Sequence, residues 1–388
     1  MSTAPVARNR SLPPAGDATV RARRSGRFAG RAHAVARALA LRRRQPHAPE
    51  NPQRILIAHH LLLGDTLMLT PLLKKLRTLH PRADIAMTVP HAIAPIYASQ
   101  PYGVRALPFD PRQPASVLYA EAPFDLALVP GDNRYAWLAA AMRARWIVAF
   151  AGDRPATKSW QADRLLPYPA QPAAWGDMVA QLIDGPAPAP YRTSEWRAPA
   201  CGAFAKPPPP YAVLHIGASS ALKRWASDRW RDIAKRLSAR GMTPVWSAGA
   251  QETALVAAAD PERRFPSLAG RLDLAQLWHL LQHARVLVAP DTGVAHLGRV
   301  VGVPTVALFG PGSALLCGAG EFWRDAPYRA VTVDPFPCRD QRTLFKREIG
   351  WVRRCQRSVA ECPEHLCMPA IPFAAVEAAI DAVTGGSA

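Results

Sequence analysis

The sequence predicts an α/β protein built from two similar domains in series. Short apolar runs rich in β-branched residues alternate with helical stretches, this alternation occurs in both halves of the 388-residue chain, and a proline-rich stretch separates the halves. Strands that alternate with helices form a parallel sheet wrapped on both faces. Because ligands bind beyond the carboxyl ends of such strands, we expect two Rossmann-like domains that face a cleft.

Composition and charge limit the classes of ligand that the protein could bind, but they do not identify its function. The chain is 49% hydrophobic and 20% charged, as a globular protein is, and its formal net charge is +19. Residues 1–50 hold eleven Arg against Asp17 and Glu50 and so supply +9, and the other residues supply +10. A basic surface suits a sugar nucleotide, a phosphorylated glycolipid, nucleic acid or an anionic membrane.

Residues 1–50 form a basic extension that we expect to be disordered or partly helical. A basic amphipathic stretch over residues 35–41 could touch anionic lipid; the alternative is an extension without a role or a misplaced start codon. No apolar run in the chain approaches the roughly 20 residues that span a bilayer, and no hydrophobic segment of signal-peptide length opens it. We therefore expect a cytoplasmic protein, with peripheral contact to the inner membrane as an option.

The first domain is predicted over residues 51–184. We expect strands at residues 55–58, 85–89, 104–107, 124–129 and 146–150, and helices at residues 64–79, 135–142 and 175–183. Pro71 predicts a kink or a restart within the first helix. Asp65 follows Gly64 at the turn that leads into this helix. Its carboxylate could cap the helix or act as a general base that removes a hydroxyl proton.

A linker and a second domain follow. Residues 185–210 end in four consecutive prolines, so they cannot hold a regular helix and predict an interdomain linker. The second domain is predicted over residues 211–330. We expect strands at residues 211–216, 243–247, 286–289 and 303–309, and helices at residues 227–240, 251–259 and 272–283 and from about residue 293. Ser227 or Asp228 is the expected cap of its first helix, and Gly302 ends its last one.

Residues 285–311 predict a phosphate site. An apolar strand stops at Pro290, and Asp291, Thr292 and Gly293 stand at the start of the next helix. The free backbone N–H groups at such a helix start favour a phosphate. Asp291 could instead merely cap the helix.

The loop after the first strand of the second domain supplies further candidates. Lys223 presents a flexible ammonium that suits a diphosphate and could offset the charge on a leaving nucleoside diphosphate, although most lysines are solvated surface residues. Arg224 cannot be distinguished from it by sequence. Gly217, Ala218 and Ser219 could bring backbone N–H groups to the phosphates or form an ordinary turn.

Residues 331–388 are predicted as a cysteine-rich segment followed by a helix at residues 373–383. Cys338, Cys355, Cys362 and Cys367 could hold zinc or iron tetrahedrally, but their spacing lacks the tight C-x2-C pairs of ordinary zinc sites. Free buried thiols are the alternative. In a cytoplasmic chain, disulfides are not expected.

Two stretches carry a family resemblance. D-T-G-x-x-H-L from Asp291, followed by G-V-P-T-V-A-L-F-G-P, is the more specific one, and R-I-L-I-A-H-H-L-L-L-G-D-T-L-M-L-T-P from Arg54 is the other. Over about residues 54–383 the chain resembles the family-9 glycosyltransferases, the ADP-heptose:lipopolysaccharide heptosyltransferases. It departs from the family at His59, His60 and Leu61, where members commonly carry an Arg and small polar residues, and this departure concerns the acceptor.

The resemblance implies a GT-B type architecture and an inverting, metal-independent transferase. It would move heptose from ADP-L-glycero-D-manno-heptose to an inner-core lipopolysaccharide sugar, with Asp65 as the base. Lys223 and the helix start at Thr292 and Gly293 would hold the diphosphate. The implied partners are an ADP-sugar and an anionic glycolipid rather than nucleic acid.

Other residues have roles that the resemblance leaves open. Glu252 lies where the family places an acidic residue on the nucleoside ribose, although Glu is also common in the first turn of a helix. Asp291 and His296 would shape the loop or contact the donor. No DXD metal signature stands in the expected cleft, so no cofactor is required. In some bacterial relatives that glycosylate autotransporters a similar cysteine-rich stretch binds iron, so a structural metal at the four cysteines stays an alternative.

Two further functions are weighed against this one. The first is a GT-B glycosyltransferase that uses another nucleotide sugar or a protein acceptor. The second is a basic protein that binds nucleic acid or membrane through its Arg-rich extension, in which Asp65 and Lys223 would be dispensable.

Overall fold

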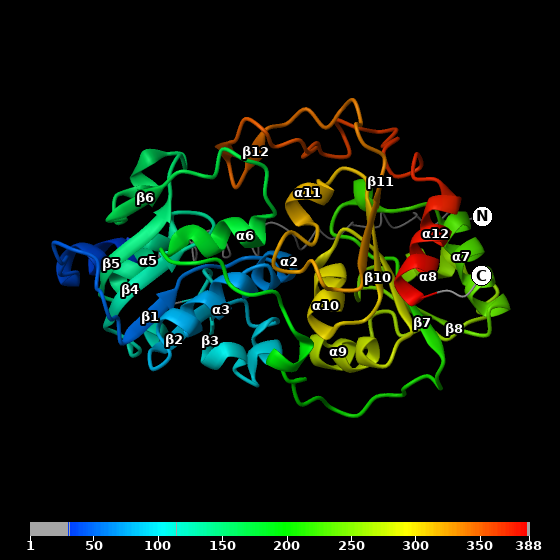
Figure 1. The fold of residues 1–388 in the computed structure, drawn as a ribbon, viewed down its shortest axis with the longest axis horizontal. Coiled ribbons are helices and arrows are strands. Elements are labelled where there is room, and N and C mark those ends of the chain that lie inside the picture. Colours follow the sequence, from blue (N-terminus) through cyan, green and yellow to red (C-terminus); the bar gives the residue numbers. More distant parts are fainter. Residues whose placement is uncertain (1–29, 31, 114, 386–388) are drawn as a thin grey trace, which may run out of the picture.

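The computed structural model describes residues 30, 32–113 and 115–385, and it contains two parallel β-sheets that lie one after the other along the molecule (Figure 1). The part of the basic extension before residue 30 lies outside the described residues. Among the residues that are described, no helix has both the length and the apolar character needed to cross a membrane.

The first sheet has six strands in the order β3-β2-β1-β4-β5-β6, and every neighbouring pair is parallel. Its strands are β1 (Arg54–Ile57), β2 (Asp84–Val89), β3 (Val104–Pro108), β4 (Phe124–Val129), β5 (Ala144–Phe150) and β6 (Arg164–Leu166). Its helices are α2 (Leu63–Leu67), α3 (Thr70–Leu79), α4 (Ser116–Tyr119), α5 (Tyr135–Ala141) and α6 (Trp175–Val179). The strand order changes direction between β1 and β4, and α2 follows β1 at this switch point.

The second sheet has five strands in the order β11-β10-β9-β7-β8, again all parallel. Its strands are β7 (Tyr211–His215), β8 (Thr243–Ser247), β9 (Val286–Pro290), β10 (Thr305–Phe309) and β11 (Tyr328–Thr332). Its helices are α7 (Ser227–Ala239), α8 (Thr253–Ala259), α9 (Leu274–Gln282), α10 (Gly293–Val301) and α11 (Ala314–Cys317). Here the order changes direction between β7 and β9. The predicted α/β fold with two Rossmann-like domains is confirmed.

The observed helix ends test several predictions of where helices begin and end. The predicted restart at Pro71 is confirmed, because Pro71 lies in the first turn of α3, where a missing N–H costs nothing. Gly302 ends α10 with a left-handed backbone (φ 82°), as predicted. The expected cap of α7 is wrong: Ala226 occupies the N-cap position, and Ser227 is already helical. The sequence analysis missed two strands of the parallel sheets, β6 and β11, because they are partly exposed strands at sheet edges and lack a continuous apolar run.

The extension was expected to be disordered or partly helical, and its last part is helical. Residues 32–41 form a helix whose Ala34 and Ala38 are buried against the first domain. Arg42 follows this helix, forms a buried ion pair with Asp163 and donates to the carbonyl of Ala144 at 3.1 Å. Arg37 and Arg44 add to this attachment, because Arg37 Nε donates to the carbonyl of Ala141 at 3.0 Å and Arg44 lies 3.7 Å from Asp163.

Two connections link the domains. The linker packs Tyr191 and Trp196 into the core between them, and a hydrogen bond of 2.7 Å joins Tyr191 Oη to the carbonyl of Val300. After β11, residues 336–357, which we call the crossing segment, pass back over the first domain and form the hairpin β12 (Thr343–Leu344) and β13 (Arg347–Glu348). The chain then returns to the second domain, where α12 (Phe373–Thr384) packs Val376 and Ile380 into that domain's core.

Candidate active site

A cleft of about 830 Å³ lies between the two domains at the carboxyl ends of both sheets. It is lined by every residue that the sequence predicted for catalysis or donor binding: Asp65, Gly217, Ser219, Lys223, Glu252, Asp291, Thr292, Gly293 and His296. Asp65 follows β1, Lys223 follows β7 and Asp291 follows β9, so each stands at the switch point of its sheet, where α/β proteins bind ligands.

Lys223 and Asp291 form an ion pair on the second domain. Lys223 Nζ lies 2.8 Å from Asp291 Oδ2 and also 2.8 Å from the Asp291 carbonyl oxygen. Burial lowers the pKa of Lys223, but the Asp291 carboxylate outweighs this and raises it above its ordinary value. The ammonium is therefore charged and held in place. Arg224, its neighbour, does not line the cleft.

The pair also decides the role of Asp291 at the start of α10. Thr292 occupies the N-cap position without a side-chain cap bond, so the interpretation of Asp291 as a helix cap is wrong. The Thr292 hydroxyl is buried and has no hydrogen-bond partner among the described residues. Together with the free N–H groups of the first helical turn, it offers donors to an anionic ligand.

Glu252 joins two loops of the second domain. Its carboxylate accepts hydrogen bonds from the N–H of Ala218 at 2.8 Å and of Gly249 at 2.9 Å. A side chain at Gly217 would collide with this carboxylate, which explains the glycine. Glu252 stands at the N-cap position of α8 rather than in its first turn. The Ala218 N–H is thus occupied by Glu252, and the ribose contact of Glu252 stays a prediction.

Asp65 faces the cleft from the first domain. It lies in the first turn of α2 while Leu62 occupies the N-cap position, so the cap interpretation is wrong for this residue as well. The carboxylate has no hydrogen-bond or ion-pair partner among the residues that the structure describes. Burial raises the pKa of Asp65 to about 6, against the charges of Arg354 and Lys223, which lower it. A carboxylate with such a pKa can accept a proton near neutral pH.

His296 lies where the domains meet. A Cβ at Gly64 in α2 would lie only 2.7 Å from His296 Cδ2, so Gly64 permits the close approach of α2 and α10. His296 Nδ1 is hydrogen-bonded to the buried Arg299, and burial with the Arg299 charge holds the pKa of His296 well below its usual range. The ring is therefore neutral and shapes the domain contact. A donor contact of His296 stays a prediction.

Comparison with known proteins decides the family. The sequence profile described as "Glycosyltransferase family 9 (heptosyltransferase)" matches residues 120–327. The chain belongs to this family.

Single relatives agree with the family assignment. The chain is 29% identical to lipopolysaccharide heptosyltransferase 1 of Pseudomonas aeruginosa over 335 residues, which cover 76% of this chain and 92% of that protein. The solved ADP-heptose lipopolysaccharide heptosyltransferase II of E. coli superposes with a TM-score of 0.62 at 17% identity, covering 86% of this chain and 98% of the other. The iron-containing dodecameric glycosyltransferase TibC of enterotoxigenic E. coli superposes with a TM-score of 0.55 at 15% identity, covering 87% and 80%.

The family-9 protein is therefore a glycosyltransferase with the two-domain GT-B architecture. Its membership does not support the alternative of a basic protein that acts only through its Arg-rich extension.

The departure from the family after β1 has a structural explanation. His59 is fully buried, its backbone N–H donates to the Thr88 hydroxyl at 2.8 Å, and burial lowers its pKa to about 3. His60 packs its ring edge-on against Phe109. Neither of them lines the central cleft.

The four cysteines of the last segment are free thiols. Cys355 and Cys367 are buried, and Cys338 and Cys362 are partly exposed. Burial and the nearby Cys355 and Cys362 raise the pKa of Cys338, so the thiols lie near one another. Arg357 Nη1 lies 3.7 Å from Cys355 Sγ, which places a cation beside the thiols. Among the described residues no three His, Cys, Asp or Glu side chains are arranged to hold a metal ion; a structural metal at the four cysteines stays an alternative.

Sequence reasoning missed one group of cleft residues. Lys346, Arg354 and Arg357 of the crossing segment line the same cavity as Asp65 and Lys223. They belong to no motif, and only the path of the crossing segment brings them to the cleft.

Proposed function

We propose that the family-9 protein is an inverting heptosyltransferase that moves heptose from ADP-L-glycero-D-manno-heptose to an inner-core lipopolysaccharide sugar. The observation that carries this proposal is the placement of Asp65 and Lys223, which come from opposite domains and line one cleft. A proton acceptor thus faces a cation across the space where an acceptor hydroxyl and a donor diphosphate would meet. We assign the donor to the domain of residues 211–330 and the acceptor to the domain of residues 51–184.

In the proposed reaction Asp65 takes the proton from the acceptor hydroxyl as its oxygen attacks the anomeric carbon. The bond from that carbon to the diphosphate breaks, and its electron pair leaves with ADP. Lys223 and the helix start at Thr292 and Gly293 stabilise the charge on the leaving group. Because the base and the leaving-group site belong to opposite walls of the cleft, a single displacement would invert the anomeric centre.

The nucleoside end of the donor is assigned to the region around Glu252. Leu268, Leu272, Leu274 and Leu277 line the cleft and offer an apolar surface for a base. The loop that carries Leu268 lies beside Glu252, since the Gly270 N–H donates to the carbonyl of Ala248 at 2.9 Å. The names of the relatives support ADP-heptose as the donor.

The proposed mechanism requires no metal. The cleft carboxylates of the donor wall are engaged, Asp291 by Lys223 and Glu252 by two backbone N–H groups. The charge of the diphosphate would then be balanced by side-chain cations and helix N–H groups.

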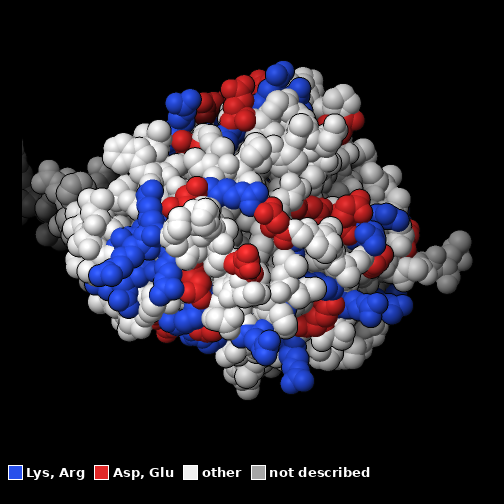
Figure 2. Space-filling view, turned by 60° about the vertical axis from the view of Figure 1, so that its left-hand side comes forward, with Lys and Arg blue, Asp and Glu red and all other residues white. Residues whose placement is uncertain are grey.

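We further propose that the enzyme works in the cytoplasm at the inner membrane. In the helix of residues 32–41, Leu39 and Leu41 are exposed, and Arg43 and Arg44 follow. One face of the molecule also gathers Lys and Arg in a broad patch (Figure 2). Such a surface suits anionic lipid, and an anionic glycolipid acceptor would be reached there. Sedimentation with anionic vesicles should deplete the protein, and neutral vesicles should not.

Calorimetric titration with ADP, UDP and GDP, without added metal, tests the donor assignment. Wild type should prefer ADP, and Lys223→Ala should bind it more weakly. Transfer from ADP-heptose to a heptose-deficient inner-core acceptor should then be measurable with chelator present. A preference for UDP would move the function to another nucleotide sugar, and folded protein that binds no nucleotide would refute the proposal.

A further inference from the structure

The crossing segment is attached to both domains by buried arginines. On the second domain, Arg339 donates from Nε to the carbonyl of Gly310 at 2.8 Å and from Nη2 to the Thr332 hydroxyl at 2.8 Å. These bonds fix the beginning of the segment beside β10 and β11.

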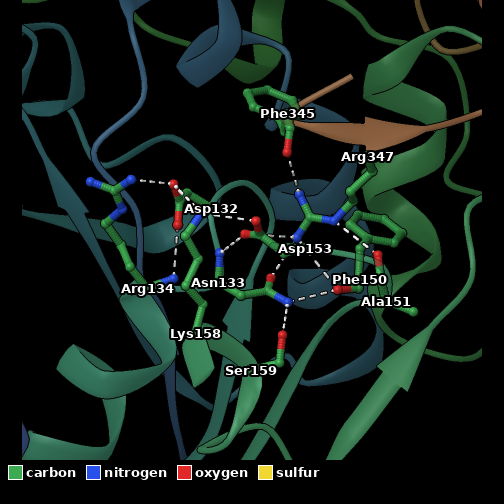
Figure 3. A network of polar contacts seen from close by, with 10 residues as sticks. All are labelled: Asp132, Asn133, Arg134, Phe150, Ala151, Asp153, Lys158, Ser159, Phe345 and Arg347. Atoms are coloured by element: carbon green, nitrogen blue, oxygen red, sulfur yellow. Dashed lines mark hydrogen bonds and ion pairs between the residues drawn. The ribbon is translucent and has the colours of Figure 1, made fainter. Parts of the chain in front are cut away.

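On the first domain, Arg347 enters a buried polar network (Figure 3). It donates from Nη2 to Asn133 Oδ1 at 2.6 Å and from Nε to the carbonyl of Ala151 at 2.9 Å. Its guanidinium lies 3.5 Å from Asp153, whose carboxylate also pairs with Lys158 at 2.8 Å. A buried arginine with so many partners fixes the far end of the segment.

Between the network of Arg347 and the cysteines, the chain returns to the donor side. Arg354 and Gln341 exchange two backbone hydrogen bonds of 3.1 Å, and the next N–H, of Cys355, donates to the carbonyl of Pro311 at 2.9 Å. Pro311 lies in the loop that follows β10, at the carboxyl end of the second sheet. The backbone of Arg354 is therefore held against the donor domain.

The side chain of Arg354 is a cation without a partner among the described residues. It lines the cleft, its Nε is buried without a hydrogen bond, and it forms no ion pair among the described residues. Two other cleft cations are occupied: Lys223 pairs with Asp291, and Arg357 pairs with Asp340 at 2.8 Å. A buried N–H without a partner costs free energy unless a ligand satisfies it.

The charges in the cleft indicate what that ligand is. Asp291 neutralises Lys223, and Asp65 and Glu252 add negative charge, so these four residues alone would repel a diphosphate. Lys346 also lines the cleft, but it is exposed. Arg354 is a partly buried cation that reduces this repulsion, and it acts on the pKa of Asp65 as well as on that of Lys223.

We propose that Arg354 binds the phosphate of the donor that is attached to the sugar, an inference that rests on the proposed function. When the acceptor oxygen bonds to the anomeric carbon, the electron pair of the broken bond passes to this phosphate. Arg354 keeps its proton and stabilises the added charge through its N–H groups. The crossing segment thus brings a third element to the site, which neither sheet supplies.

Arg354→Gln tests this role, with Arg353→Gln as the matched control. Arg353 is the preceding residue and is exposed, and within the described part of the chain it donates only to the carbonyls of Gly350 and Val352. In full-length protein, Arg354→Gln should weaken ADP binding about ten- to a hundredfold and leave adenosine binding unchanged. Arg354→Lys should recover part of the loss, and Arg353→Gln should match wild type.

Other results of these binding measurements would overturn the inference about Arg354 or the donor assignment separately. Unchanged ADP affinity in Arg354→Gln, with a raised KM for the acceptor, would place Arg354 on the acceptor and overturn the inference. An equal loss of ADP and adenosine binding would show a merely structural role and would also overturn it. If wild type prefers UDP, the donor assignment fails, but the same loss measured with UDP still supports Arg354. If wild type binds neither a nucleoside diphosphate nor inorganic pyrophosphate, both proposals fail.

Discussion

The two walls of the cleft differ in how their polar groups are satisfied. On the second domain, Lys223 and Asp291 bind each other, and Glu252 binds the N–H groups of Ala218 and Gly249. On the first domain, Asp65 has no partner among the described residues and stands beside apolar Leu62, Leu63 and Met68. The proposed donor wall is thus preorganised before a ligand arrives, whereas the proposed acceptor wall presents one carboxylate that has no partner among the described residues. Substitutions on either wall test this difference.

Removing the single carboxylate of the acceptor wall should have the largest effect. Asp65→Asn should lower kcat by about a thousandfold, because the amide cannot accept the proton. The affinity for ADP should not change, since the donor wall is untouched. Transfer kinetics and calorimetry on the same preparation check both. Retained kcat would remove Asp65 from the mechanism.

Breaking the ion pair of the donor wall should come next. Lys223→Ala should lower kcat/KM by about a hundredfold and also lower the melting temperature, because Asp291 is left buried without its partner. In the double variant Lys223→Met with Asp291→Asn, stability should return while activity stays low. Arg224→Ala, one residue on and outside the cleft, serves as the control. Equal losses in the Arg224 and Lys223 variants would contradict the assignment.

Glu252 should act on the nucleoside rather than on the phosphates. Glu252→Ala should weaken ADP and adenosine alike, about tenfold, because two loops lose the carboxylate that joins them. Glu252→Gln should weaken them less, since its amide oxygen can still accept one of the N–H groups. Calorimetric titration with both ligands distinguishes this pattern from a loss confined to ADP, which would place Glu252 at the phosphates.

The pKa of Asp65 predicts two pH dependences. kcat/KM should fall below pH about 6 with the slope of one proton, because only the carboxylate form is a base. The folded pKa lies above the unfolded value of 3.8, so the stability contribution of Asp65 is present at low pH and lost as pH rises through about 6. At pH 7.5, Asp65→Asn should therefore melt about 2 °C above wild type, and at pH 4 the two should coincide. A higher melting point at pH 4 alone would reverse the sign and refute the argument.

Two truncations of the extension should have the smallest effect on catalysis. Deleting residues 1–29 should leave kcat within about twofold of wild type, because all residues that line the cleft follow residue 61. Deleting residues 1–44 removes the Arg42–Asp163 pair and the packing of Ala34 and Ala38, so it should lower the melting temperature by a few degrees. Loss of transferase activity on deletion of residues 1–29 would show that the extension takes part in catalysis.

Much of the fold and of the site was determined by local sequence. Buried strands are recognisable in the sequence as apolar runs. A residue that directly follows such a run lies at the carboxyl end of the sheet. Asp291 was found in this way, because position after a strand is a local property. Asp65 and Lys223 lie further along the chain from their strands, and the family resemblance was needed to favour a functional role for them. The partly exposed edge strands β6 and β11 have no such run, so the sequence did not predict them.

What the tertiary structure alone decided depends on contacts between distant segments. The sequence allowed Asp291 to cap α10, but Lys223, 68 residues away, binds its carboxylate instead. The sequence allowed Arg42 to be disordered, but Asp163 holds it. Arg354 carries no motif, and it reaches the cleft only because Arg339 and Arg347 fix the crossing segment to both domains. A charged side chain takes whichever partner burial brings near it, and burial is a property of the whole fold rather than of the neighbouring residues.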